Sequence, residues 1–126
     1  MHEVSIAEGI MEIVSNAAAK AGAKSVSEVR VAVGELSAVE TEALSFAFES
    51  VKKGTVADRA RLVIERPEGR AWCLDCRREV PLHRFGDACP LCGGYHLAPT
   101  QGRDMKVIDL KADSGPDDAP DEQRNF

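Results

Sequence analysis

The stretch Cys73-Leu74-Asp75-Cys76, followed after twelve residues by Cys89-Pro90-Leu91-Cys92, contains all four cysteines of this chain. Two Cys-x-x-Cys pairs separated by such a loop can bring four thiolates to one tetrahedral point, which is the ligand set of a closed structural zinc site. Two disulfides would need an oxidising compartment, and the first residues lack the pattern of a signal peptide. An iron–sulfur cluster is a further alternative, because it also takes four thiolates. The spacing favours Zn(II) held by Cys73, Cys76, Cys89 and Cys92.

The second cysteine pair has more turn-forming residues than the first. Pro90 fixes φ inside the second turn, and Gly93-Gly94 can adopt the positive φ that lets backbone amides fold back toward the sulfurs. Arg77-Arg78 follow the first pair instead. We therefore expect the turn around Cys76 to form with less help from its own residues.

Apolar residues recur at helical spacing in two segments. From Val4 to Ala21 they predict an amphipathic helix with one core-facing stripe, ended by Gly22. The stripe consists of Ala7, Ile10, Met11, Val14, Ala17, Ala18 and Ala21. A second helix is predicted through Val51, with Ser37-Ala38-Val39-Glu40 as a capping box at its start and Gly54 at its end.

Three other segments have the pattern of strands. Valines alternate with other residues from Val29 to Val33, and a similar alternation from Ala60 to Ile64 ends before Pro67. The segment from Met105 to Leu110 reads as a third strand. A single strand cannot stand alone after a zinc module, so we expect it to return to the sheet formed by the first two.

These elements predict an α+β fold, in which a small three-stranded sheet with two helices carries an inserted four-cysteine zinc module. Residues 1–68 with residues 103–111 form the predicted α+β domain, and residues 69–102 form the zinc-binding module. Residues 112–126 hold five acids and one arginine, a net charge of −4, so the remainder of the chain accounts for only −1 of the total −5. This composition, with two prolines and few apolar residues, predicts a disordered acidic tail.

Nucleic-acid binding is not expected of the zinc module. Residues 66–103 contain six arginines and four acids, and four thiolates with one Zn²⁺ would add a charge of −2, so the module is formally neutral. The positive surface that dominates nucleic-acid affinity is therefore missing. We expect the aromatic residues Trp72, Phe85 and Tyr95 to cover the metal and the small core. No apolar run approaches the roughly 20 residues of a membrane span, and we expect a cytoplasmic protein.

An enzyme is not expected either. The sequence has no phosphate-binding glycine loop, and the zinc site uses every cysteine, which leaves no thiol nucleophile. A catalytic zinc ion keeps an open position beside three protein ligands, and four cysteines argue against that arrangement. His83 lies between the cysteine pairs and His96 follows the second; either can bond a thiolate, but we expect surface positions for both.

The first three residues, Met1-His2-Glu3, offer nitrogen donors just before a predicted helix. A free α-amine, an imidazole and deprotonated backbone amides can lie in one plane, which suits Ni²⁺ or Cu²⁺. Binding near neutral pH must displace protons from the amine and the imidazole. Taken alone, the pattern is far more typical of a terminus that frays and binds nothing.

Several segments of the chain resemble the HypA/HybF family, whose members are nickel-insertion accessory proteins for [NiFe]-hydrogenase maturation. The likeness covers residues 1 to about 111. It is carried by Met1-His2-Glu3-Val4-Ser5-Ile6-Ala7, by Gly34-Glu35-Leu36-Ser37-Ala38-Val39-Glu40, by Glu42-Ala43-Leu44-Ser45-Phe46-Ala47-Phe48-Glu49, and by the paired Cys-x-x-Cys motifs. Ala38 and Thr41 stand where relatives often have glycine and proline, which affects only the expected entry into the second helix.

The resemblance implies a metallochaperone with a nickel-binding α+β domain and a separate zinc module. It implies transient Ni(II) binding by the His2 imidazole, the Met1 terminal amine and the Glu3 backbone nitrogen, and structural Zn(II) at the four cysteines. It also implies transfer of nickel, with a nickel-delivery GTPase, to the precursor of the hydrogenase large subunit. The rival hypothesis is a zinc-ribbon scaffold or regulator that binds protein or nucleic acid and never needs nickel.

Overall fold

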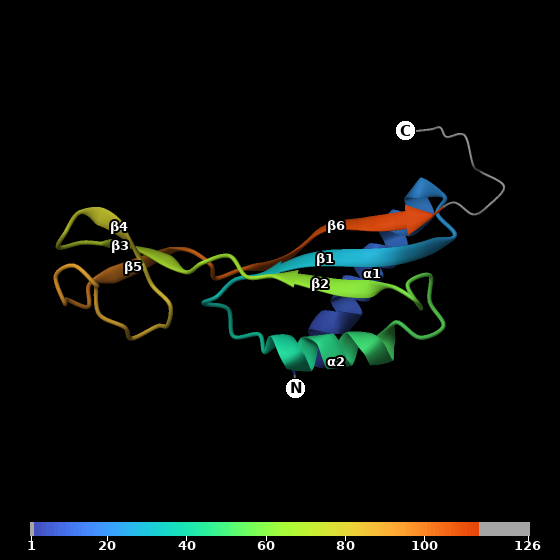
Figure 1. Ribbon diagram of the computed structural model, residues 1–126, viewed down its shortest axis with the longest axis horizontal. Helices are drawn as coiled ribbons and strands as arrows, with labels where there is room; N and C mark the ends of the chain where they lie inside the picture. The colour runs from blue at the N-terminus through green and yellow to red at the C-terminus, as the bar shows by residue number, and fades with distance from the viewer. Residues whose placement is uncertain (1, 114–126) are drawn as a thin grey trace. The chain divides into compact units, whose positions relative to one another are not determined.

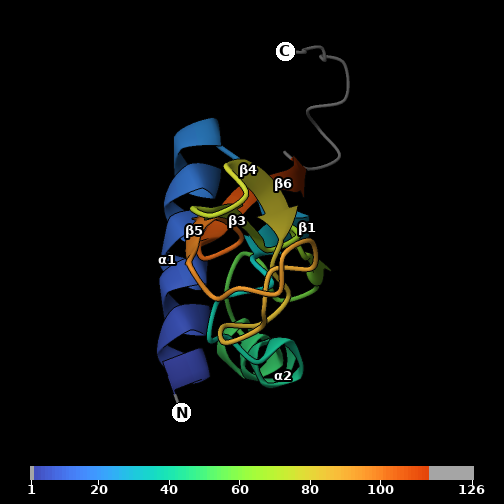
Figure 2. The ribbon, with the colours of Figure 1, turned by 90° about the vertical axis from the view of Figure 1, so that its left-hand side faces the viewer.

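The first element of the fold is helix α1, His2–Ala21, which begins two residues earlier than the predicted Val4. The computed structural model describes residues 2–113 of the chain. Helix α1 is uninterrupted along its length (Figure 2) and ends where Gly22 adopts a φ of 68° and Ala23 N donates to Ala18 O at 2.9 Å. Its buried residues are Glu3, Ala7, Ile10, Met11, Val14 and Ala18. The predicted apolar stripe is therefore buried, except that Ala17 and Ala21 remain partly or fully exposed.

Helix α2, Thr41–Val51, packs against α1 and buries Leu44, Ala47 and Phe48. The predicted capping box at its start is wrong, since no side chain caps the helix from the N-cap residue Glu40. The Ser37 hydroxyl instead donates to Gly34 O at 2.8 Å, which closes a turn after the preceding strand. The Glu40 amide donates to the Glu3 carboxylate at 3.0 Å, so a residue of α1 satisfies the start of α2.

Strands β1, Ser25–Val33, β2, Arg61–Glu65, and β6, Met105–Asp113, form one sheet in the order β2-β1-β6 (Figure 1). The predicted return of the third strand to this sheet is confirmed. Arg30 and Asp109 join β1 to β6 through two hydrogen bonds of 2.9 and 2.7 Å. Strand β6 continues to Asp113, two residues into the predicted tail, and the rest of that tail lies outside the described residues.

The cysteine-containing segment has a sheet of its own, which sequence reasoning did not predict. Strands β3, Arg70–Cys73, β4, Arg78–Pro81, and β5, Leu97–Gln101, pair in the order β4-β3-β5. Both pairings are antiparallel. Four- and five-residue strands give too short a period-2 pattern to identify from sequence.

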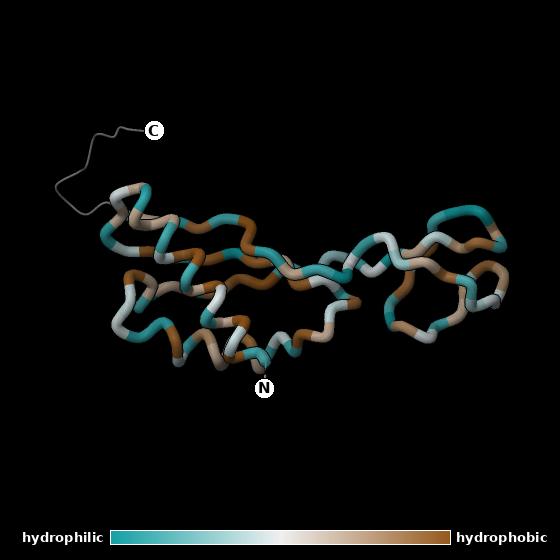
Figure 3. Tube along the Cα trace, turned by 180° about the vertical axis from the view of Figure 1, so that it is seen from behind, coloured by the Kyte–Doolittle hydropathy of each residue, from teal (hydrophilic) through white to brown (hydrophobic). Residues whose placement is uncertain are grey.

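The described chain divides into two compact units. The first comprises residues up to 30, residues 40–63 and residues from 107 onward; the second comprises residues 31–39 and 64–106. The predicted zinc module, residues 69–102, lies inside the second unit. In the first unit, hydrophobic and hydrophilic stretches alternate along the helices and strands (Figure 3), as elements with one buried face require.

The second unit has a small core made mostly of aliphatic side chains and cysteines. One cluster joins Leu36, Ala71 and Leu82, and the other joins Cys73, Val80 and Cys89. The expectation that Trp72, Phe85 and Tyr95 cover this core is wrong, because they are 42%, 58% and 71% exposed. Alternation along β3 buries Ala71 and Cys73 and therefore turns Trp72 to the other face.

Residues 34–36 form a crossing point of three backbone segments within the second unit. Glu35 N donates to Pro67 O at 2.9 Å, and Leu36 N donates to Gly102 O at 2.7 Å. A Cβ atom at Gly34 would collide with the backbone of Gly102, so this position requires glycine. The Glu35 carboxylate accepts a hydrogen bond of 2.8 Å from Gly69 N, and His83 Nδ1 lies 3.0 Å from its other oxygen.

The contact between Glu35 and His83 leads to a prediction about the protonation of both side chains. Its hydrogen bond with Glu35 raises the pKa of His83 above 6.5, with Glu68 and Asp87 adding smaller attractions. The amide of Gly69 and the imidazole of His83 lower the pKa of Glu35. The pair should therefore stabilise the fold between the ordinary pKa values of glutamate and histidine, and lose this effect as pH rises through the raised His83 pKa.

Proton NMR titration of the His83 ring checks this prediction. Glu35→Gln should return the His83 pKa toward 6.5, whereas Asp87→Asn should change it less, because Asp87 is the more minor cause. Equal His83 pKa values in the native and Glu35→Gln proteins would contradict the assigned contact.

Candidate metal centre

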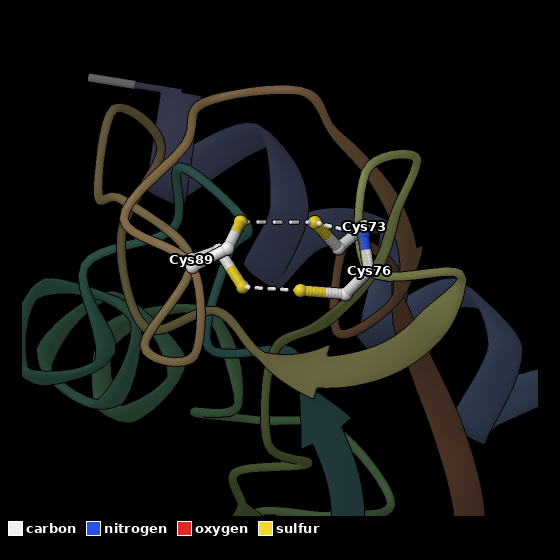
Figure 4. Close-up of side chains that lie close together, drawn as sticks. Cys73, Cys76 and Cys89 are labelled. Carbon is white, nitrogen blue, oxygen red and sulfur yellow. Dashed lines mark hydrogen bonds between the residues drawn. The ribbon is translucent and has the colours of Figure 1, made fainter.

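The four cysteine sulfurs converge on one point in the second unit, as the sequence predicted. Their Sγ atoms all lie within 4.8 Å of one another. Cys73 Sγ lies 3.8 Å from Cys92 Sγ, and Cys76 Sγ lies 3.8 Å from Cys89 Sγ. Figure 4 shows the side chains of Cys73, Cys76 and Cys89 directed toward one another. None of the four is in a disulfide, which excludes that alternative for this arrangement.

These separations fit a tetrahedral metal ion with thiolate ligands. Zn–S bonds of about 2.3 Å define a tetrahedron whose edges are about 3.8 Å long. Both closest sulfur pairs have that spacing. The four cysteines can therefore hold a metal ion without a large rearrangement of the chain.

The two cysteine pairs form equivalent turns from different residues. Arg77 N donates to Cys73 O and Gly93 N donates to Cys89 O, both at 2.8 Å. Both turn residues have positive φ, 58° for Arg77 and 75° for Gly93. Arginine is unfavourable in this left-handed region, which explains why no residue type in the first turn indicated its geometry.

Backbone amides point at the sulfurs in both turns. Cys76 N donates to Cys73 Sγ, Leu91 N to Cys89 Sγ and Gly94 N to Cys92 Sγ, each at 3.4 Å. Such donors stabilise thiolate charge, and the predicted folding of amides toward the sulfurs is confirmed.

The pKa values of Cys89 and Cys76 are shifted in opposite directions from the ordinary value of a thiol. Amides of Cys92 and Leu91 lower the pKa of Cys89 to about 7, with the Cys92 amide the larger cause. Hydrogen bonding to Cys92, followed by burial and the other thiols, raises the pKa of Cys76 to about 12. Four thiols this close cannot all ionise without a cation between them, so metal binding and deprotonation are linked.

The two histidines of the second unit pair with carboxylates. His96 Nδ1 lies 3.0 Å from Asp75 Oδ2, and Leu74 N donates to His96 O at 2.9 Å. These contacts join the first cysteine turn to the segment after the second. His83 pairs with Glu35 at the crossing point described above, and both imidazoles are exposed, as expected from the sequence.

Two of the three residues predicted to bind nickel, His2 and Glu3, lie at the start of α1. The His2 side chain is 58% exposed, whereas Glu3 is buried. The Glu40 amide is the main cause that lowers the Glu3 pKa from 4.5 to about 2. Met1, with the predicted terminal amine, lies outside the described residues.

The sequence did not reveal the hydrogen bond between the Glu40 amide and the Glu3 carboxylate. Glu40 was assigned to a capping box with Ser37, yet its amide is held by Glu3, 37 residues earlier in the chain. Glu3, the acid in the first turn of α1, was the available signal for this contact. No neighbouring residue indicated that its partner would be the Glu40 amide. This contact fixes the first turn of α1 beside the start of α2.

The fold and the site define a small α+β protein with a four-cysteine metal centre and a histidine at the beginning of its first helix. Among the described residues, no helix combines the length and apolar character needed to cross a membrane. Residues 1–112 match the family model described as "Hydrogenase/urease nickel incorporation, metallochaperone, hypA". The chain belongs to this family of nickel metallochaperones that serve hydrogenase maturation.

Individual relatives agree with this assignment. The chain is 46% identical over 110 residues to a hydrogenase maturation factor HypA from Polaromonas naphthalenivorans. The matched residues cover 87% of this chain and 96% of the relative. It is 47% identical over 110 residues to a protein of the same description from an Azoarcus species, with the same shares covered. The solution structure of the nickel metallochaperone HypA from Helicobacter pylori matches with a TM-score of 0.65 and 26% identity, covering 91% of this chain and all of that one.

Replacement of one sulfur should remove the metal and loosen only the second unit. We expect Cys73→Ser to lose metal and to lose amide exchange protection in β3, β4 and β5, because this small core depends on metal binding for its folding. Helices α1 and α2 should keep their protection. Leu74→Ser, a change at an exposed neighbour that keeps all four thiols, is the control. Full metal content in Cys73→Ser would contradict a four-thiolate site.

A second prediction concerns Arg77 and Gly93, the residues with positive φ in the two cysteine turns. Gly93→Ala should destabilise the metal-loaded protein by about 1 kcal/mol, because alanine has a Cβ that disfavours positive φ. Arg77→Gly should relieve similar strain, but the added unfolded-state entropy offsets it by roughly 0.5–1 kcal/mol. Denaturant unfolding measures both changes. A Gly93→Ala protein as stable as the native one would show that the turn does not require left-handed geometry.

Proposed function

We propose that this protein binds Ni(II) through His2, the Met1 terminal amine and the Glu3 backbone nitrogen, and holds structural Zn(II) at its four cysteines. It then passes nickel, with a nickel-delivery GTPase, to the precursor of the hydrogenase large subunit. The transfer proceeds by ligand exchange and needs no catalysis. The protein acts in the cytoplasm, where thiols stay reduced and available to metal.

The position of His2 at the first turn of α1 carries this proposal. The first four N–H groups of a helix have no carbonyl partner within that helix. A metal ion can therefore replace the proton of such an amide without breaking a helical hydrogen bond. His2 is exposed, so its imidazole is free to turn toward the same ion.

The buried carboxylate of Glu3 supports the same site. The helix dipole places partial positive charge at the N-terminus, which opposes a bound cation. Glu3 contributes a negative charge in this turn, with its carboxylate 3.0 Å from the Glu40 amide and 3.8 Å from His2 Nδ1. This contact also limits the motion of the first turn, so the His2 imidazole and the Glu3 backbone nitrogen remain close together.

Different donor atoms keep the two metals apart. Thiolates in a tetrahedron favour zinc, whereas nitrogen donors in a plane favour nickel. The zinc site includes the buried residues Cys73 and Cys89 and contributes to folding, so its metal should exchange slowly. The nickel site uses an exposed imidazole and the end of the chain, which suits reversible binding and release.

The rival hypothesis of a zinc-ribbon scaffold that never needs nickel is not favoured. The match to a nickel metallochaperone family covers residues 1–112, which include the first three residues as well as the four cysteines. A scaffold built on the zinc site alone would place no requirement on the N-terminus.

Nickel titration by calorimetry tests the proposed ligands. His2→Ala and a protein extended by a few residues ahead of Met1 should each bind nickel at least about tenfold more weakly. Removal of a residue that only hydrogen-bonds to a metal ligand already weakens binding by about that factor. Extension converts the amine into an amide, which must lose a proton before it can bind. Glu3→Gln should bind nickel more strongly than either variant, because its backbone nitrogen is unchanged.

The controls separate this site from other effects. His83→Ala removes an exposed imidazole elsewhere and should bind nickel normally, and zinc content should be constant in all variants. Tight nickel binding by the extended protein would disprove coordination by the terminal amine. Normal binding by His2→Ala as well would overturn the nickel assignment at this end of the chain.

A further inference from the structure

The four cysteines share one centre but differ in their access to solvent. Cys73 and Cys89 are buried, with exposed fractions of 0% and 2%, and both belong to a core cluster with Val80. Cys76 is of intermediate exposure, whereas Cys92 is exposed. A small solute that diffuses to this centre therefore meets Cys92 before the other three sulfurs.

The residues after Cys92 explain this exposure. Gly93 and Gly94 complete the second turn, and neither has a side chain that can lie over the sulfur. A Cβ atom at Gly94 would lie 3.4 Å from Cys92 Sγ, in close contact with it. The same glycine pair that forms the turn thus adds no side chain over this sulfur.

Thiolate chemistry makes the uncovered sulfur a reaction site. A thiol bound to zinc stays deprotonated, and a thiolate is the form that oxidants attack. In a first step, Cys92 Sγ attacks one oxygen of hydrogen peroxide, the O–O bond breaks, and a sulfenic acid and hydroxide form. In a second step, Cys73 Sγ, 3.8 Å away, attacks the sulfenic sulfur, an S–S bond forms and hydroxide leaves. Two thiolates are oxidised by two electrons, and one peroxide is reduced to two hydroxide ions.

We propose that Cys92 is the site at which hydroperoxides oxidise this protein, with Cys73 as the resolving cysteine, and that the resulting disulfide expels zinc. Zinc would lose two of its four ligands over these two steps, because only Cys76 and Cys89 remain as thiolates. The second unit relies on the metal for its folding, so the oxidised protein loosens there. A thiol reductant reverses the reaction by disulfide exchange and allows zinc to bind again.

The inference rests on zinc occupancy of the cysteine site, which metal analysis of the starting protein establishes separately. A protein isolated without zinc would count against the proposed function, whereas the oxidation pattern of zinc-loaded protein tests only the present proposal. The two failures are therefore distinguishable.

The experiment treats the zinc-loaded full chain with graded hydrogen peroxide. Released zinc is measured with a chromogenic chelator, while parallel samples are alkylated and their cysteine peptides mapped by mass spectrometry. We expect one zinc released per disulfide, with Cys92 as the first cysteine oxidised and Cys73 as its partner. Zinc should bind again after treatment with dithiothreitol and added zinc.

Specific outcomes overturn the proposal. First oxidation at Cys73, Cys76 or Cys89 would show that exposure does not select the reacting sulfur. A Cys89–Cys92 disulfide would overturn the assignment of Cys73. Failure of dithiothreitol to restore zinc binding would show oxidation beyond the disulfide.

A matched pair of variants tests access directly. Gly94→Ala places a methyl group beside Cys92 Sγ. Asp75 Oδ2, which pairs with His96 and lies 3.1 Å from the added atom, must move by a few tenths of an ångström to admit it. This variant should keep its zinc and release it several-fold more slowly with peroxide. Gly9→Ala, where a methyl meets nothing within 4 Å, should release zinc at the native rate. Equal rates in all three proteins would contradict control by access to Cys92.

Discussion

The convergence of four sulfur atoms on one point is the constraint on which the second unit depends. Two equivalent turns bring the sulfurs within 4.8 Å of one another and aim backbone amides at three of them. The surrounding core is small and includes two of the cysteines themselves. Thiolate charges at this distance repel, so a cation at the centre offsets the repulsion that the fold creates. The short strands β3, β4 and β5 serve chiefly to hold this geometry.

The first unit depends on a contact of another kind. Helix α1 buries an acid in its first turn, and the Glu3 carboxylate accepts a hydrogen bond from the amide at the start of α2. This bond satisfies a helix terminus that has no side-chain cap of its own. It also holds the first turn of α1 beside the start of α2. His2 and Glu3, two of the residues proposed to bind nickel, lie in that turn.

The two proposed metal sites differ in donor atom, burial and expected exchange. Buried sulfurs suit a metal that supports folding, and exposed nitrogens suit a metal that is passed on. The four sulfurs are themselves not equivalent, because Cys92 lies at the surface while Cys73 and Cys89 do not. One ligand of a site with structural geometry is thus an exposed residue, and the proposed route of oxidation begins there.

Features that depend on local spacing could be predicted from residue patterns alone. The cysteine quartet, the buried stripe of α1, the third strand of the first sheet and the family resemblance were all readable from residue patterns. Contacts between residues distant in the chain could be assigned only from the folded structure. The Glu40 amide bonds to the Glu3 carboxylate and not to Ser37. Arg30 bonds to Asp109, and His83 pairs with Glu35. The folded structure also revealed that Arg77 takes a left-handed conformation and that Trp72 faces solvent. A carboxylate or an imidazole can satisfy many partners, and the fold alone selects which one lies within hydrogen-bonding distance.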